Sequence, residues 1–312
     1  MMGDIVLNRL TKTYGKGEIK AVDEVSFSVE KGERFGLIGP DGAGKTSIFR
    51  MLATLLLPDG GTASVSGYDV VGDFRQIRRH IGYMPGKFSL YQDLSVEENL
   101  GFFATVFNTS VRQNYDLIKD IYVQLAPFKQ RRAGALSGGM KQKLALCCAL
   151  IHRPKVLFLD EPTTGVDSVS RKEFWEMLKG LKKEGITVLV STPYMDEASL
   201  CERIALMQSG EMLTIDSPDE IIRNFKGDLY AVRAFPMSQL LGVLKKNPLV
   251  ASCFSFGEYH HITFKDESVD GQSVTMKELL LFNELTDQGY EELEIKRITP
   301  TIEDCFIQLM NR

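Results

Sequence analysis

Short apolar runs alternate with longer amphipathic stretches through the first two thirds of the chain. Runs that are apolar or alternate with a period of two predict strands, and apolar spacings of three and four predict helices. The strands are expected at Ile5–Leu7, Val25–Val29, Arg34–Ile38, Thr62–Val65, Val156–Leu159 and Thr187–Ser191. The helices are expected from Lys45 to about Leu56, at Gly138–Ile151 and at Ser168–Lys183. This alternation indicates an α/β fold with a mostly parallel sheet that is covered on both faces.

Residues 95–126 read as a helical stretch, with Ser95 as a possible cap and Glu97 and Glu98 in the order of a capping box. The pattern changes after Pro218. Strands are expected at Leu229–Phe235, Ala251–Phe256, His261–Phe264 and Leu293–Ile298, and helices at Met276–Leu285 and Ile302–Met310. We therefore expect an α/β domain over residues 1–220, with a helical insert at about 87–137, and a small α+β domain over residues 221–312.

Composition narrows the class of protein without identifying it. The 312 residues are 44% hydrophobic and 25% charged, and the net charge of −4 argues against binding of nucleic acid through a large basic surface. The five cysteines include no CxxC pair, which favours a reducing compartment. The longest purely apolar run, Leu144–Ile151, is too short to cross a bilayer, so any membrane span must come from a partner.

Residues 39–46 read Gly-Pro-Asp-Gly-Ala-Gly-Lys-Thr and fit the phosphate-loop pattern GxxxxGK[ST] between an apolar strand and a helix start. Glycines let several backbone N–H groups point at one anion, and the helix adds its positive N-terminal end. Lys45 is expected to reach the β- and γ-phosphates of a nucleotide, and the Thr46 hydroxyl to bind Mg²⁺.

Two carboxylates and a second glycine-rich helix start complete the candidate chemistry. The apolar strand 156–159 ends in Asp160, expected to hold Mg²⁺ through its water shell, and Glu161, expected to polarise the attacking water. Ser137, Gly138 and Gly139 open a predicted helix and form a second anion site; alone, this would be a serine cap followed by flexible glycines.

With these residues in view, the sequence resembles the ATP-binding subunit of an ABC transporter over residues 4–217. The elements that carry the resemblance are Walker A at 39–46, a signature at 136–140, Walker B at 156–160, Glu161 as the catalytic-type glutamate, and a D-loop-like segment at 164–167. The resemblance implies a P-loop NTPase cassette with ATP and Mg²⁺ as cofactors. It implies that nucleotide is held by Tyr14, Gly39, Pro40, Asp41, Gly42, Ala43, Gly44, Lys45, Thr46, Ser47, Ser137, Gly138 and Gly139.

Tyr14 falls where the family stacks a ring on adenine; a tyrosine that packs at a strand end is the less favoured alternative. The phrases at 67–70, 194–198 and 301–306 are similar to the drug-export branch, which works with type-2 permeases. In that family two subunits sandwich two ATP molecules, each between one chain's Walker A and the other's signature, and the helical insert receives the permease.

Two residues depart from the family pattern. The Q-loop glutamine is replaced by Gly86, and the switch histidine by Pro193, which lacks even a backbone N–H. Gln92 is a loop residue rather than a substitute for the glutamine. None of the four histidines, His80, His152, His260 and His261, lies where it could replace the switch. We therefore expect slow hydrolysis at this chain's own Walker A and an intact signature that completes a partner's site.

These features predict an ATPase subunit of an exporter, located in the cytoplasm on the inner face of the membrane. The expected partners are membrane permease subunits and a second ATP-binding subunit, as a heterodimer rather than a homodimer, without nucleic acid. A soluble ABC ATPase without a permease is disfavoured by the single cassette and the acidic balance. A regulatory subunit without turnover stays open. His260 and His261 are expected to face solvent at a strand start.

Overall fold

The computed structural model describes residues 3–265 and 273–311, which divide into two compact units. The first unit runs to Ile221 and also takes in the chain from Leu309, and the second covers Ile222–Gln308. No helix within the described ranges is long and apolar enough to span a membrane.

The first unit contains ten strands and seven helices of the α type within the described chain. Its strands are β1 (Ile5–Tyr14), β2 (Ile19–Val29), β3 (Arg34–Ile38), β4 (Gly60–Val65), β5 (Tyr68–Asp69), β6 (Ile81–Met84), β7 (Val156–Asp160), β8 (Thr187–Thr192), β9 (Arg203–Gln208) and β10 (Glu211–Asp216). Its helices are α1 (Lys45–Leu52), α2 (Phe74–His80), α3 (Val96–Val106), α4 (Tyr115–Tyr122), α5 (Gly138–Leu150), α6 (Ser168–Leu181) and α7 (Pro218–Arg223), the last of which ends just past the unit boundary.

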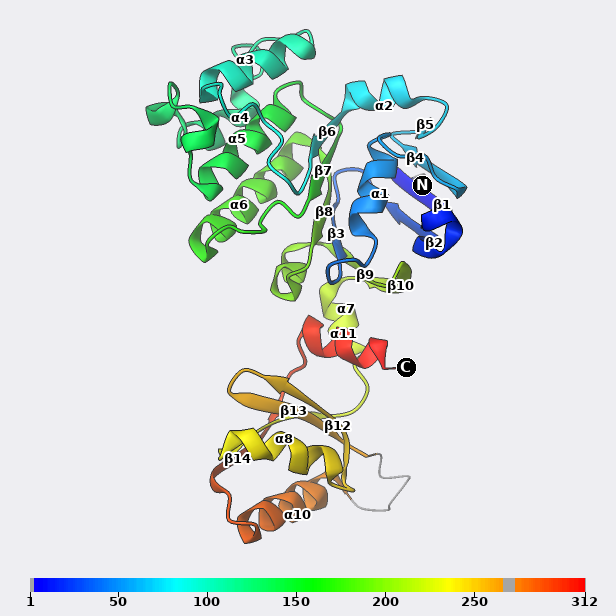
Figure 1. Ribbon diagram of the computed structural model, residues 1–312, viewed down its shortest axis with the longest axis vertical. Coiled ribbons are helices and arrows are strands. Elements are labelled where there is room, and N and C mark those ends of the chain that lie inside the picture. The colour runs from blue at the N-terminus through cyan, green and yellow to red at the C-terminus, as the bar shows by residue number, and fades with distance from the viewer. Residues whose placement is uncertain (1–2, 266–272, 312) are drawn as a thin grey trace. The chain divides into compact units, whose positions relative to one another are not determined.

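A six-stranded sheet in the order β10-β9-β3-β8-β7-β6 forms the centre of this unit. All its neighbouring strands are parallel except β10, which pairs antiparallel with β9. Every residue of β7 and β8 is buried, as a parallel sheet covered on both faces requires. Figure 1 shows α5 and α6 on one side of this sheet and α1 on the other. The predicted α/β fold is confirmed.

Three predicted strands, Ile5–Leu7, Val25–Val29 and Thr62–Val65, do not join the parallel sheet. They are parts of the longer strands β1, β2 and β4, in a separate sheet of order β2-β1-β4-β5 whose pairings are antiparallel. This second sheet shares one core with α1 and the central sheet, in which Phe49 of α1 lies edge to face with Phe158 of β7.

The helical segment predicted over residues 95–126 divides into α3, α4 and a 3₁₀ turn at 126–128. The Ser95 capping box is confirmed, since the Glu98 N–H donates to Ser95 Oγ at 3.2 Å and the Ser95 N–H donates to Glu98 Oε2 at 2.7 Å. The helix predicted from Lys45 ends at Leu52 rather than Leu56, because Thr54 adopts a left-handed φ of 60°.

The second unit has the order βαββαβ followed by a helix. Its elements are β11 (Leu229–Phe235), α8 (Met237–Lys246), β12 (Val250–Phe256), β13 (Tyr259–Phe264), α10 (Val274–Asp287), β14 (Glu291–Ile298) and α11 (Ile302–Met310). The sheet is antiparallel in the order β12-β13-β11-β14, a ferredoxin-like arrangement. Leu240, Leu244, Leu281 and Leu285 of the two long helices share its core. The predicted α+β character is confirmed.

His260 and His261 correct the expectation of a solvent-facing pair. His260 is 4% exposed, and neither of its ring nitrogens has a hydrogen-bond partner among the described residues. His261 Nδ1 lies 2.7 Å from the buried carboxylate of Asp304, and its ring stacks on Phe256. Alternate residues of β13 face opposite sides of the sheet, so His260 lies on the side of the core residue Ile262 and His261 on the side where Asp304 lies.

His152, just after α5, predicts a pH dependence of stability. Its Nε2 lies 2.9 Å from the Ile81 carbonyl, and its ring stacks on Phe107 with centroids 3.7 Å apart. Burial lowers the pKa of His152 to about 4. The unfolded chain then binds a proton from about pH 6.5 downward while the folded chain does not, so stability is full above pH 6.5 and falls toward pH 4.

We therefore expect the free energy of unfolding to drop by up to about 2 kcal/mol more in the wild type than in His152→Gln between pH 7.5 and 5. Glutamine keeps a donor for the Ile81 carbonyl but does not titrate. Urea unfolding followed by fluorescence of the single tryptophan, Trp175 of α6, reports on this unit. Equal pH profiles for the two proteins would contradict the expectation.

Candidate nucleotide site

The predicted phosphate loop connects the end of β3 to the start of α1. Gly44 has a φ of +106°, and a Cβ there would lie 2.0 Å from the Ala21 carbonyl oxygen. A Cβ on Gly39 would lie 2.2 Å from the Met207 carbonyl oxygen. Only glycine fits these two positions, because other residues meet backbone atoms that cannot move aside. Asp41 and Gly42 are exposed at the tip of the loop.

The rest of the loop is held by backbone hydrogen bonds. The Ala43 N–H donates to the Pro40 carbonyl at 3.2 Å, and the Ala43 carbonyl accepts from the Gly210 N–H at 3.0 Å. The Gly39 N–H donates to the Thr192 carbonyl at the end of β8, at 3.4 Å. The loop is therefore fixed against the central sheet without any side chain from its tip.

Lys45 is a buried cation, 3% exposed, at the first position of α1. Its Nζ donates to the carbonyls of Gly39 at 2.8 Å and Pro40 at 2.9 Å, and lies 3.3 Å from the Glu161 carboxylate. A buried ammonium needs such oxygen partners. A phosphate group can take the place of one of them, because the helix start also favours an anion.

Asp160 brings the phosphate loop and the central strands together. One of its carboxylate oxygens accepts hydrogen bonds from the Thr46 hydroxyl at 3.2 Å and from the Ser191 hydroxyl at 2.8 Å. Burial raises the pKa of Asp160, and these two hydrogen bonds act in the opposite direction. A hydroxyl and a carboxylate side by side are the hard oxygen ligands that Mg²⁺ requires, so the residues fit a magnesium ion.

Glu161 follows directly in a left-handed conformation, with a φ of +51°. Such a backbone is uncommon for a residue with a side chain, and it is held here because the Glu161 N–H donates to Ser191 Oγ at 3.0 Å. Its carboxylate accepts from the Thr164 hydroxyl at 3.5 Å. The turn directs the carboxylate toward Lys45 rather than along the strand.

Tyr14 lies at the end of β1 with 39% of its surface exposed. Its hydroxyl lies 3.2 Å from the Ser47 hydroxyl, so both predicted residues flank the same helix start. The neighbouring backbone is anchored by Asp59, which accepts from Lys12 Nζ and from the Thr13 N–H and hydroxyl. Those hydrogen bonds lower the pKa of Asp59 to about 2. An exposed ring on an anchored strand end can stack on a base.

The signature residues lie apart from this cluster. Ser137 caps α5 by accepting from the Met140 N–H at 3.3 Å, and Ser137 and Gly138 are exposed. Among the described residues no hydrogen bond joins them to the phosphate loop. Gly139 is buried against α6, where a Cβ would lie 2.6 Å from Ser170 Oγ. The structure thus brings together the Walker A and Walker B residues and leaves the signature facing outward.

The two departures from the family pattern occur at the site itself. A Cβ on Gly86 would lie 3.1 Å from the Asp160 carbonyl oxygen and 3.7 Å from Glu161 Cβ. Pro193 follows Thr192, whose carbonyl accepts from the phosphate loop. Gln92 lies beside Gly134 instead, since its backbone carbonyl accepts from the Gly134 N–H and its Oε1 would lie 3.7 Å from a Cβ on Gly134. Both positions therefore border the site without a side-chain donor.

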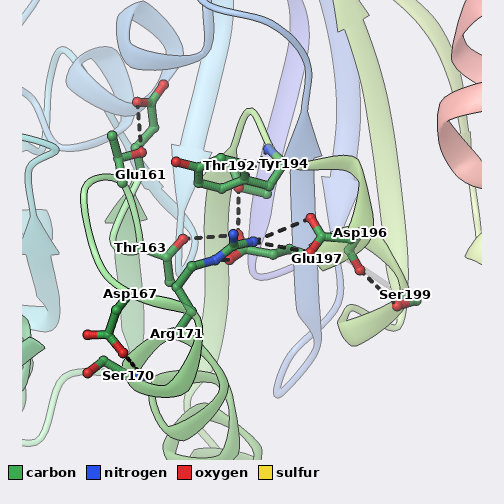
Figure 2. A network of polar contacts seen from close by, with 11 residues as sticks. Glu161, Thr163, Asp167, Ser170, Arg171, Thr192, Tyr194, Asp196, Glu197 and Ser199 are labelled. Carbon is green, nitrogen blue, oxygen red and sulfur yellow. Dashed lines mark hydrogen bonds and ion pairs between the residues drawn. The ribbon is translucent and has the colours of Figure 1, made fainter. Parts of the chain in front are cut away.

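One buried polar cluster in the same region was not predicted from the sequence (Figure 2). Glu197 is 2% exposed and accepts from the Thr192 hydroxyl at 2.6 Å, the Thr163 hydroxyl at 3.0 Å and Arg171 Nε at 3.0 Å. We call these four residues the Glu197 cluster. Glu197 lies in the phrase 194–198 that contributed to the resemblance, but only the fold brings Arg171 of α6 to it.

The fold and the site define a P-loop nucleotide-binding cassette with an inserted helical segment. The profile of the ABC transporter family matches residues 22–164. Over 229 residues the chain is 39% identical to the doxorubicin resistance ATP-binding protein DrrA of Mycobacterium tuberculosis, covering 72% of this chain and 69% of that protein. The chain belongs to the ATP-binding proteins of the ABC transporter family.

A longer alignment, 39% identical over 322 positions, joins 98% of this chain to the probable multidrug ABC transporter ATP-binding protein YbhF of Escherichia coli. This chain spans 52%, or about half, of that relative's length. A dimeric bacterial ABC transporter cassette matches with a TM-score of 0.62 and 27% identity, over 68% of this chain and 98% of that one. The resemblance and the cassette fold expected from sequence are confirmed.

The glycine loop yields a prediction with a matched control. Gly44→Ala places a methyl group on the Ala21 carbonyl at a forbidden φ, so nucleotide binding should be lost and stability should fall by roughly 3 kcal/mol or more. Gly42 also has a positive φ, +80°, but a Cβ there would meet no atom within 4 Å, so Gly42→Ala should lower the free energy of unfolding by only about 1 kcal/mol. Thermal unfolding and titration with a fluorescent ATP analogue measure both, and equal effects would contradict the steric explanation.

Proposed function

We propose that this chain is the ATP-binding and ATP-hydrolysing subunit of an ABC-type exporter. The observation that carries the proposal is the meeting of Lys45, Thr46, Asp160 and Glu161 at one edge of the central sheet. In this function Lys45 and the loop N–H groups hold the phosphates, and Tyr14 supports the adenine. Mg²⁺ would be held by Thr46 and Asp160 and would neutralise charge on the phosphates.

Glu161 is the group best placed to accept a hydrogen bond from the attacking water. It lies beside Lys45, and its left-handed turn aims the carboxylate across the loop. Catalysis of phosphoryl transfer depends on positioning and charge stabilisation rather than on covalent chemistry. These residues are therefore sufficient to bind ATP and to start hydrolysis.

Hydrolysis at this chain's own site is proposed to be slow. Gly86 and Pro193 occupy the positions where the family has side chains that reach the water and the γ-phosphate, and neither has a polar side chain that could donate a hydrogen bond. Losing one such contact costs about 10² to 10³ in rate. The exposed Ser137 and Gly138, together with the buried Gly139 beside them, are proposed to complete the ATP site of a second, complete subunit in a head-to-tail heterodimer.

Membrane permease subunits are the proposed partners, with the chain peripheral on the cytoplasmic side. A cavity of about 430 Å³ supports this assignment, since it lies between β6 and the helical insert and is mostly apolar. Its lining includes Tyr83, Phe88, Phe103, Phe107 and Cys148. An apolar cavity of this kind can accept the apolar anchor side chains of a short permease helix that lies across it. The curated relatives named for drug resistance and export favour an exporter.

The asymmetric arrangement predicts opposite effects of two substitutions when a complete partner is present. Glu161→Gln removes the base from the slow site and should change ATP turnover by less than about twofold, whereas Ser137→Arg blocks the partner's site and should lower turnover roughly 10²-fold. Phosphate release by the reconstituted pair measures both. The reverse result would mean that this chain supplies the working catalytic site.

Restoring the missing side chains is a second test. Gly86→Gln and Pro193→His together should raise turnover by the purified chain at least about tenfold. Gly86 has an ordinary backbone conformation, and its nearest neighbour at 3.1 Å must move by only a few tenths of an ångström. Adding Glu161→Gln to this variant should abolish the gain. If the variant folds and binds ATP but its turnover does not rise, the explanation of the slow site is wrong.

A further inference from the structure

The carboxylate of Glu197 is buried and is surrounded by donors from three different segments. Thr192 ends β8, Thr163 lies in the loop after β7, and Arg171 lies in the second turn of α6. A buried carboxylate is costly unless it is paired and hydrogen-bonded, and here one cation and two hydroxyls satisfy it. Removing it leaves three donors without their acceptor.

Arg171 is itself fixed from several sides (Figure 2). Its guanidinium lies 4.0 Å from the centroid of the Tyr194 ring and 3.2 Å from the exposed carboxylate of Asp196. The Tyr194 N–H donates to the Thr192 hydroxyl at 3.1 Å, and that hydroxyl donates to Glu197. The ring that stacks on Arg171 is therefore linked to the same carboxylate as Arg171 itself. The segment after β8 and the start of α6 are therefore one rigid unit, because the geometry of a guanidinium fork leaves little freedom.

The signature rests on the opposite side of the same loop. A Cβ on Gly139 would lie 2.6 Å from Ser170 Oγ, and one on Gly138 would lie 3.5 Å from the Gly165 carbonyl oxygen. Asp167 caps α6 by accepting from the Ser170 N–H at 3.0 Å. The position of the signature glycines is thus set by residues 165–170, and those residues are held between Thr163 and Arg171 of the Glu197 cluster.

We infer that Glu197 is a positioning residue for the signature of its own chain, acting through the loop 163–170. The inference rests on the proposed function, in which this signature completes a second subunit's ATP site. Glu197 is not placed to touch nucleotide, since its carboxylate is occupied by Thr163, Thr192 and Arg171. Its removal should therefore slow turnover without weakening ATP binding at this chain's own Walker A.

The test compares the wild type with Glu197→Gln, which keeps the shape and loses the charge, each as the full chain reconstituted with a complete partner subunit. Turnover in Mg-ATP (kcat) should fall roughly tenfold or more, since small displacements of a positioned group cost up to about 10²-fold. KM and the Kd of a fluorescent ATP analogue should stay within about threefold. Thr163→Val, which removes one donor only, should lower kcat in the same direction by less.

Glu33→Gln is the matched control. Glu33 is also a buried glutamate, 7% exposed, and pairs with Arg203 at 3.2 Å at the opposite ends of the strands. This variant should lose comparable stability with kcat unchanged. An equal fall of kcat in both variants, or an unchanged kcat in Glu197→Gln, would overturn the inference.

The double variant of Glu197→Gln with Ser137→Ala separates this inference from the proposed function. If Glu197 acts through the signature, Glu197→Gln should have little further effect on kcat once Ser137→Ala has removed the hydroxyl. If the fold-losses of the two substitutions instead multiply, the inference is contradicted. A wild type without turnover, or a Ser137→Ala variant with full turnover, would overturn the proposed function instead. Hydrogen exchange at residues 138–141 then decides: faster exchange in Glu197→Gln than in Glu33→Gln supports the positioning role, and equal exchange overturns it.

Discussion

The in-register parallel pairing of β3, β8 and β7 is the constraint on which the rest of the cassette depends. Ile38 pairs with Thr192, and Asp160 pairs with Ser191, so three strands end at the same level. Parallel strands deliver their carboxyl ends to one edge of a sheet. The phosphate loop, the acidic strand end and the segment after β8 therefore meet, although Thr46 of the first and Asp160 of the second lie 114 residues apart in the sequence.

The buried side chain of Ser191 holds both acidic residues at this edge of the sheet in place. Its hydroxyl donates to the Asp160 carboxylate and accepts from the Glu161 N–H, so it orients one acid and holds the left-handed turn of the next. Lys45 lies across the same gap, and its ammonium is satisfied by two loop carbonyls and Glu161. The site is thus organised in advance of any ligand, which lowers the reorganisation needed at the moment of reaction.

Strands and loops that are set by local sequence were predicted, whereas features that depend on contacts between distant residues were missed. The central strands and the glycine loop were predicted because continuous apolar runs and the loop pattern leave few alternatives. Most of β1 was missed because register shifts after Leu7 and Leu10 interrupt its alternation. Helix α8 and the hairpin β9–β10 were not assigned, and the role of Glu197 was invisible because Arg171 lies 26 residues away.

The side chains that are present and those that are missing differ in physical role. Lys45, Thr46 and Asp160 are the residues proposed to hold a nucleotide in its ground state, and the Glu197 cluster contacts the loop on which the signature glycines rest. Gly86 and Pro193, by contrast, stand where a side chain would act on the reacting water and the γ-phosphate. Differential stabilisation of the transition state accelerates a reaction, and uniform binding does not. The proposed division of labour follows from this difference: a chain that keeps the binding residues and lacks these two side chains would hold one ATP and complete another subunit's site.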